Sequence, residues 1–379
     1  MTRAQAFDVA ALLADPETRI VVCCGSGGVG KTTIAAALAL RAAESGRRVV
    51  VLTIDPARRL AQSMGLGELD NTPRAVRDVE GTGSLDAMML DMKRTFDELV
   101  VAHTDPERAQ QVLVNPFYVA LSSSFAGTQE YMAMEKLAQL RDRSEADGSW
   151  DLIVVDTPPS RSALDFLDAP KRLGSFLDGR FIRILSAPAK GAGRGFGRVF
   201  GVGVGLVSSV LSRVVGTQLL SDVSTFVETL ETIFGGFRSR ADATYRLLQA
   251  RGTAFVVVAA PETDAIREAT YFVDRLASEG MPIEGLVLNR VTVSPAEALT
   301  AEEAIVGAET LEESGQHIVT AALLRMHADT VRTAARQRHL AERFTAAHPG
   351  VAQVVVPALA DDVHDLDGLR EIGCLLAGS

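Results

Sequence analysis

The sequence predicts an α/β fold built on a doubly wound, mainly parallel sheet, and three observations support this prediction. Short apolar runs rich in β-branched residues recur along the chain and are typical of strands. These runs show little apolar–polar alternation, as expected when helices cover both faces of a sheet. Residues 19–55 read as strand, glycine-rich loop, helix and strand, which is the βαβ unit of a parallel sheet.

The elements can be placed in order along the chain. The first strand is expected at 19–24, where the run "RIVVCC" ends at a glycine. Helix formers fill 31–46, and Gly46 is expected to end that helix. The remaining strands are expected at 48–55, 84–91, 151–156, 253–260, 283–289 and 352–357.

Two long stretches between the strands read as mostly helical, which predicts a single domain over 1–379 with an inserted helical subdomain. Within this subdomain, glycines recur every four residues in 191–216, a pattern that fits either one face of a helix or a mobile loop. The sheet is expected in residues 15–92, 150–160 and 252–379, and the helical subdomain in 93–149 and 161–251.

Composition and charge exclude several classes. The net charge is −10, which argues against a nucleic-acid partner. The chain has no uncharged apolar run of 18 residues, and acidic residues interrupt its N-terminal apolar stretch, so we expect a cytoplasmic protein. Cys23, Cys24 and Cys374 form no C-x-x-C pair and are expected to be small buried hydrophobic residues rather than zinc ligands.

A phosphate-binding motif lies between the first strand and the first helix of the βαβ unit. Residues 25–32, "GSGGVGKT", fit G-x-x-x-x-G-K-[ST], which is the motif of P-loop NTPases. Lys31 is expected to reach the β- and γ-phosphates of a nucleotide, and Thr32 to ligate Mg²⁺. The loop and helix start that would bind the nucleotide comprise Gly27, Gly28, Val29, Gly30, Lys31, Thr32 and Thr33.

Two aspartates each close a predicted strand, at the carboxyl end where ligands gather in open α/β sheets. Asp156 closes the strand at 151–156 and could hold a Mg²⁺-bound water. Asp55 closes the strand at 48–55 and could position or deprotonate the attacking water, together with Lys31 as the catalytic pair. A helix-capping role is the alternative for each aspartate.

The motifs "GSGGVGKTT", "TIDPARRL", "DTPPS", "PET", "LVLNRV" and "VVVPALADDVHDLDGL" follow one another in an order that resembles the ArsA family. This family of deviant Walker A ATPases includes the arsenite-pump ATPase and the ATPase that guides tail-anchored membrane proteins. The resemblance implies ATP and Mg²⁺ as cofactors, Asp55 in switch I and Asp156 in the Mg²⁺ shell. It also implies that Asn289 contacts the adenine beneath a loop at Pro357, although a turn residue is the local alternative for Asn289.

The chain departs from the family pattern at Ser26, where relatives carry a lysine that reaches the partner subunit's phosphates. Serine is short and uncharged, so two copies of this chain would lack that lysine at both sites. We therefore predict a heterodimer with a lysine-bearing paralogue. A homodimer in which Ser26 is simply tolerated is the alternative. The C-x-x-C of the eukaryotic relatives is also missing.

Three functions stay open on sequence grounds. The first is targeting of hydrophobic membrane-protein clients, with peripheral membrane contact. The segments 130–140 and 196–216 are candidate client surfaces, unless their apolar residues only pack the subdomain core. The second is the catalytic subunit of an arsenite-type anion transporter, which needs convergent thiolates. The third is a partition-type ATPase, for which the short C-terminal tail offers no signal.

Overall fold

The computed structural model describes residues 5–55, 59–115, 118–119, 128–158, 237–296, 298–315 and 317–378. The chain forms two compact units. The first comprises Met1–Met89, Arg143–Ala163 and Leu248–Ser379, and the second comprises Leu90–Asp142 and Leu164–Leu247. The glycine-patterned segment 191–216 lies outside the described residues.

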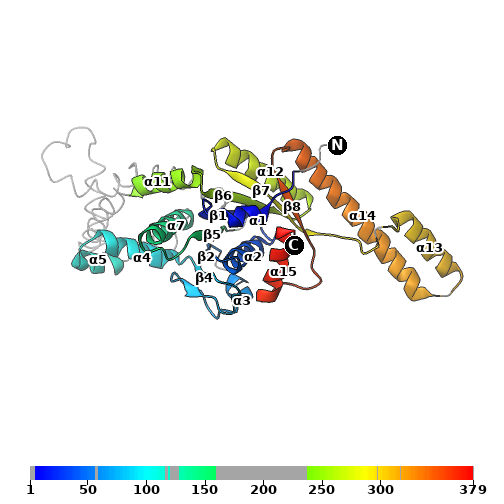
Figure 1. Cartoon of the computed structure of the whole chain (residues 1–379), viewed down its shortest axis with the longest axis horizontal. Helices are drawn as coiled ribbons and strands as arrows, with labels where there is room; N and C mark the ends of the chain where they lie inside the picture. The colour runs from blue at the N-terminus through cyan, green and yellow to red at the C-terminus, as the bar shows by residue number, and fades with distance from the viewer. Residues whose placement is uncertain are drawn as a thin grey trace, which may run out of the picture. The chain divides into compact units, whose positions relative to one another are not determined.

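The first unit is built on an eight-stranded sheet with the order β3-β4-β2-β5-β1-β6-β7-β8 (Figure 1). Every pair of neighbours is parallel except β3 and β4, which confirms the predicted α/β fold. The two-residue β3 was not predicted, because so short a run carries no periodicity. The strands are β1 (Ile20–Gly25), β2 (Arg48–Thr53), β3 (Arg74–Ala75), β4 (Ser84–Met89), β5 (Leu152–Asp156), β6 (Thr253–Ala259), β7 (Ile283–Val291) and β8 (Gln353–Pro357).

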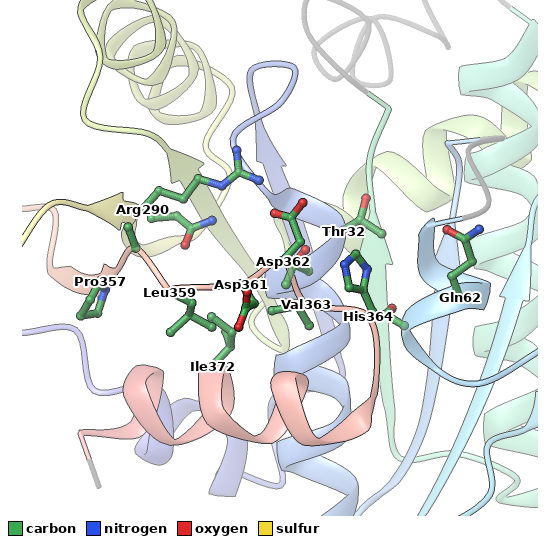
Figure 2. Close-up of a pocket in the computed structure, with 14 residues that line it drawn as sticks. Thr32, Gln62, Arg290, Pro357, Leu359, Asp361, Asp362, Val363, His364 and Ile372 are labelled. Carbon is green, nitrogen blue, oxygen red and sulfur yellow. The ribbon is translucent and has the colours of Figure 1, made fainter.

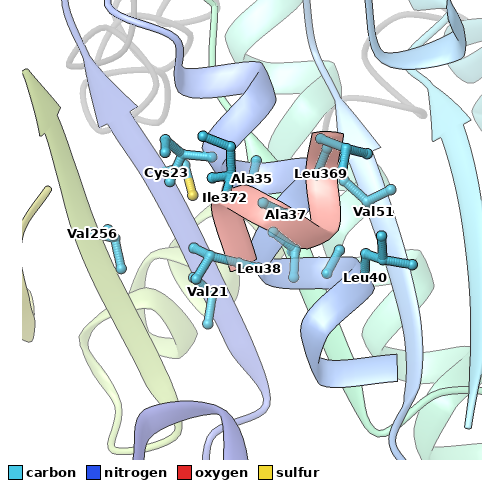
Figure 3. Packing of buried hydrophobic residues seen from close by; sticks show 14 of the residues in the cluster. Val21, Cys23, Ala35, Ala37, Leu38, Leu40, Val51, Val256, Leu369 and Ile372 are labelled. Atoms are coloured by element: carbon cyan, nitrogen blue, oxygen red, sulfur yellow. The ribbon is translucent and has the colours of Figure 1, made fainter. Parts of the chain in front are cut away.

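One face of the sheet packs against α2 (Lys31–Glu44), with α1 (Val9–Ala14) and α15 (Leu366–Ala377) beside it. Ten of the fourteen residues of α2 are buried, because its small alanines let the helix lie close to the strands. Leu369 and Ile372 of α15 pack into the same cluster, together with Cys23 and Val256 (Figure 3). Cys23 and Cys24 are buried as expected, whereas Cys374 is only half-buried.

A helical hairpin follows β7 and was not predicted from the sequence. Its arms are α13 (Ala301–Glu313) and the 30-residue α14 (Ile318–Ala347). Ala304 and Ala328 are fully buried where the arms meet, since small side chains allow close helix approach (Figure 1). α14 also contacts α12 (Thr263–Ser278), which packs on β6, and it leads directly into β8.

The described helices of the second unit are α4 (Met92–His103), α5 (Pro106–Leu113) and most of α7 (Thr128–Asp147) and α11 (Phe237–Gln249). Met132 and Met134 of α7 are each 1% exposed, so neither forms part of an exposed client surface. Val101, Val114 and Val119 are instead exposed by 58%, 76% and 40%. No described helix combines the length and apolar character needed to cross a membrane.

Candidate functional site

The loop between β1 and α2 depends on glycine at two positions. Gly25 has φ +151°, and a Cβ atom there would lie 2.0 Å from the main-chain oxygen of Val258. Gly30 has φ +91°, and its Cβ would lie 2.3 Å from Nδ2 of Asn289. Side chains are therefore excluded at both positions by backbone conformation and by neighbours. The loop is thereby held against β6 and β7, at the N-terminus of α2.

Lys31 occupies the loop in the conformation described. Its Nζ donates a 2.7 Å hydrogen bond to the main-chain oxygen of Ser26. Burial lowers the pKa of the Lys31 ammonium, and nearby Asp156 opposes that shift. The hydroxyl of Ser26 is itself buried and has no hydrogen-bond partner among the described residues. In this state the Ser26 carbonyl accepts the Lys31 hydrogen bond, and a phosphate oxygen could take its place.

Strand register brings Asp156 next to the loop. Asp156 on β5 pairs with Cys23 of β1 on one side and Thr53 of β2 on the other. Its Oδ2 accepts hydrogen bonds from Thr32 at 2.8 Å and from Thr53 at 2.9 Å. Burial raises the pKa of the Asp156 carboxyl to about 6, although both hydrogen bonds oppose the shift.

The second oxygen of Asp156, Oδ1, is buried and has no partner among the described residues. A carboxylate oxygen and the Thr32 hydroxyl are hard oxygen ligands of the kind that Mg²⁺ uses. No cluster of three or more His, Cys, Asp or Glu side chains suited to a metal occurs in the described part of the chain. This donor set fits a Mg²⁺ ion that takes its other ligands from water and phosphate.

Asp55 follows β2 and is half-buried. Its main-chain N–H donates to the Thr53 hydroxyl at 3.2 Å, so Thr53 links Asp55 to Asp156. Asp55 also raises the pKa of both Lys31 and Asp156, as expected for a carboxylate close to each. The residues that follow, 56–58, are not described. Sequence reasoning missed Thr53, which reaches Asp156 through the pairing of β2 with β5.

A cavity of about 540 Å³ adjoins the loop and the start of α2 (Figure 2). Asn289 is 5% exposed and donates through Nδ2 to the main-chain oxygen of Val29 at 2.8 Å. Its Oδ1 is therefore the group left to accept a hydrogen bond from a ligand. Pro357 also lines this cavity. Lining residues to which sequence reasoning gave no role include Gln62, Arg290, Asp361, Asp362 and His364, although all except Gln62 lie within the motifs quoted for the family resemblance.

The fold and the loop together define a P-loop nucleotide-binding protein. Thr32 bonds Asp156 directly, and the neighbouring Lys31 bonds the main-chain oxygen of Ser26. Asn289 clamps the loop from β7, and Thr33 and Pro357 line the adjoining cavity. A family model described as "Anion-transporting ATPase" matches residues 18–305, which is well over half of the chain. The chain therefore belongs to this ATPase family, as the sequence resemblance predicted.

Three relatives illustrate the match. An "Arsenical pump-driving ATPase" of Acidiphilium multivorum is 30% identical over 156 residues, 41% of this chain and 26% of that protein. An "ATPase get3" of Neurospora crassa is 24% identical over 269 residues, 70% of this chain and 71% of that protein. A protein of Mycobacterium bovis, described only as an ATPase, is 22% identical over 372 residues, 95% of this chain and 92% of that protein.

The matches differ in the share of each relative that they cover. Matches to two arsenical pump-driving relatives span about a quarter of those proteins, 27% and 26%. Matches to the relatives named ATPase get3 span 70% or more of theirs.

Proposed function

We propose that the chain binds and hydrolyses ATP with Mg²⁺ at the loop between β1 and α2. The observation that carries this proposal is the direct link from Thr32 to Asp156, at 2.8 Å, beside a lysine held within the loop. A P-loop lysine and threonine with a strand-end aspartate are the parts that phosphoryl transfer requires.

Each residue has a role in this proposal. Lys31 exchanges the Ser26 oxygen for the β- and γ-phosphates, and the amides of Gly27 to Thr33 face the phosphate chain. Thr32 holds the Mg²⁺, and Asp156 orients its water ligands. Asp55 positions the attacking water, and Asn289 accepts from the adenine amino group beneath Pro357. Bound Mg²⁺ neutralises charge that develops on the phosphates.

The test compares Mg²⁺–ATP binding and phosphate release for the wild type and for Asp55→Asn. Asp55→Asn is expected to bind ATP within about threefold of wild type while losing ~10²-fold or more of its turnover. Wild-type protein that binds no ATP in the presence of Mg²⁺ would overturn the proposed activity. An Asp55→Asn variant with normal turnover would remove Asp55 from the mechanism.

We also propose that the working form is a heterodimer with a lysine-bearing paralogue. Ser26 carries no charge and is only 8% exposed, so it cannot extend to a partner's nucleotide. Native mass spectrometry of the protein from its own cell is expected to show a second P-loop subunit. Turnover should rise when that subunit is co-expressed. Full turnover by the isolated chain would contradict this proposal.

We further propose that ATP hydrolysis drives the binding and release of hydrophobic membrane-protein segments, and that the ATPase is cytoplasmic. Relatives named ATPase get3 match over most of their length, and the second unit exposes Val101, Val114 and Val119. Immobilised transmembrane-helix peptides are expected to capture the wild type in a nucleotide-dependent manner. Val114→Asp should weaken capture, whereas the matched variant Val306→Asp on the hairpin should not. Nucleotide-independent failure to bind would count against this role.

Anion transport is the second candidate, because the matching family model carries that description. Arsenite and antimonite need converging thiolates. Cys23 and Cys24 are buried within the sheet, and Cys374 is on α15, so the cysteines offer no accessible cluster. Antimonite is therefore expected to leave ATP turnover unchanged. Acceleration by antimonite would favour the transporter role instead.

A further inference from the structure

Two consecutive residues at the end of β7 both donate hydrogen bonds to the phosphate loop. Asn289 donates to the main-chain oxygen of Val29, and Arg290 donates through Nη1 to that of Gly28 at 3.1 Å. Successive side chains of a regular strand point to opposite faces, so one loop should not receive both. The local backbone of β7 must therefore differ from a regular strand.

A bulge accounts for this arrangement. The β7–β8 register shifts between Leu288 and Val291, and Arg290 adopts a left-handed φ of +61°. Arginine pays a steric cost of about 1 kcal/mol in that conformation. Bulges beside functional sites commonly redirect a side chain, and strain of this kind persists where the surroundings fix it. The bulge directs the Arg290 side chain (Figure 2) to the phosphate loop, which Asn289 also contacts through its bond to Val29.

The charged residues that line the cavity indicate what the Arg290 side chain could bind. Arg290 is the only lysine or arginine among the described residues that line it, whereas Asp361 and Asp362 add negative charge. No carboxylate of the described chain forms an ion pair with Arg290. Its bond to Gly28 uses one of five guanidinium N–H donors. A cation with open donors thus lies against the phosphate loop.

We propose that Arg290 binds the phosphate chain of the nucleotide held in the same subunit, as a second cation beside Lys31. The guanidinium reaches phosphate oxygens from the β7 side of the loop, where Ser26 supplies no charge. Arginine suits this position because its guanidinium has several N–H groups. It can keep the hydrogen bond to Gly28 and donate to a phosphate oxygen at the same time. The inference rests on the proposed nucleotide-binding function and assigns that site a further phosphate-binding residue.

The test measures dissociation constants for ATP, ADP and inorganic pyrophosphate by calorimetry, with Arg290→Gln and Arg290→Lys. Arg290→Gln is expected to weaken all three ligands by ~10-fold or more, with an unchanged melting temperature. Arg290→Lys should recover most of the loss, since it keeps the charge. Arg336→Gln removes an exposed arginine of α14 that does not line the cavity and serves as the matched control.

Pyrophosphate separates the phosphate contact from a contact to the base. Arg290→Gln with unchanged pyrophosphate affinity would overturn the inference, whatever happens to ATP. Loss of affinity that follows a lowered melting temperature and is not recovered by Arg290→Lys would assign Arg290 to loop packing and also overturn it. Wild-type protein that binds neither ATP nor pyrophosphate would overturn the proposed nucleotide-binding function, and this inference with it.

Discussion

The ammonium of Lys31 is hydrogen-bonded to the main-chain oxygen of Ser26 at 2.7 Å, so a residue at one end of the loop holds a residue at the other. The lysine is mostly buried, and that burial lowers its pKa, which means that its charge is poorly compensated in this state. A phosphate would supply the missing negative charge. We therefore expect the free loop to favour binding of an anion beside Lys31.

Lys31→Ala is expected to weaken ATP binding by ~10²-fold, since a charged hydrogen bond in a shielded site is lost. The fold should keep its stability within ~1 kcal/mol, because the variant also removes a costly buried charge. Calorimetric titration with ATP and thermal unfolding without it check both statements. Lys93→Ala, on an exposed lysine of α4, is the control and should change neither. Equal ATP affinity in Lys31→Ala would contradict the site.

Asp156 makes stability without ligand depend on pH. Its pKa is raised from 3.8 to about 6, so the folded state binds this proton more tightly than the unfolded state. Stability from this group is therefore complete below pH 3.8 and is lost as the pH rises towards 6. Asp156→Asn keeps an acceptor for Thr32 and Thr53 but has no charge to bury.

We expect Asp156→Asn to raise the free energy of unfolding by ~2–3 kcal/mol at pH 7 and by little at pH 4. Mg²⁺-dependent ATP hydrolysis should fall sharply in the same variant. Urea unfolding at both pH values, without nucleotide, measures the effect. A variant that is destabilised at pH 7 would show that Asp156 is already well compensated in the free protein.

Asn289→Ala is expected to act on stability and on base preference. The variant leaves the buried oxygen of Val29 without its donor, which costs ~1–3 kcal/mol. It also removes the Oδ1 acceptor, so the preference for ATP over GTP should fall about tenfold. Asn289→Asp keeps an acceptor and should lose stability while retaining more of the preference. Competition binding with both nucleotides decides, and an unchanged ATP-to-GTP ratio in Asn289→Ala would exclude the base contact.

Arg47 provides a prediction for the fold alone. Its guanidinium pairs with Asp151 at 3.0 Å and donates to four main-chain oxygens, including that of Thr18 at 2.7 Å. Arg47→Ala is expected to cost ~2–4 kcal/mol, and Arg47→Lys to recover little, because an ammonium cannot replace the fork. ATP affinity should not change.

Arg48→Ala is the matched control for Arg47→Ala. Its side chain is 55% exposed and contacts the same Asp151 at 3.6 Å, so less than ~0.5 kcal/mol should be lost. Equal losses from the two variants in urea unfolding would contradict the role given to Arg47.

Much of the sheet could be predicted because its strands are continuous apolar runs, and the loop because its glycines and Lys31 form a motif. The hairpin α13–α14 was missed although Thr300 and Glu303 form a capping box at its start. Its arms meet through alanines, which are weak markers of a buried face.

Side chains near the site were missed where tertiary pairing alone places them. Thr53 reaches Asp156 only because β2 and β5 are neighbours in the sheet. Arg290 follows a bulge that the letters "LNRV" do not reveal. Asp362 and His364 lie in a loop after β8 and line the cavity, and a loop has no hydrophobic periodicity from which its position could be predicted. The roles of Lys31, Thr32, Asp55, Asp156, Asn289 and Pro357 in binding and catalysis remain predictions.

The clamp between Asn289 and Val29 also bears on how the chain acquires its site during synthesis. The two residues are 260 positions apart, as the loop emerges early and its clamp late. At about 5–20 residues per second, a ribosome needs roughly 13–50 s to cover that distance. For that time the glycine-rich loop lacks the strand that fixes it. A nucleotide can therefore meet the clamped loop only once β7 has been made.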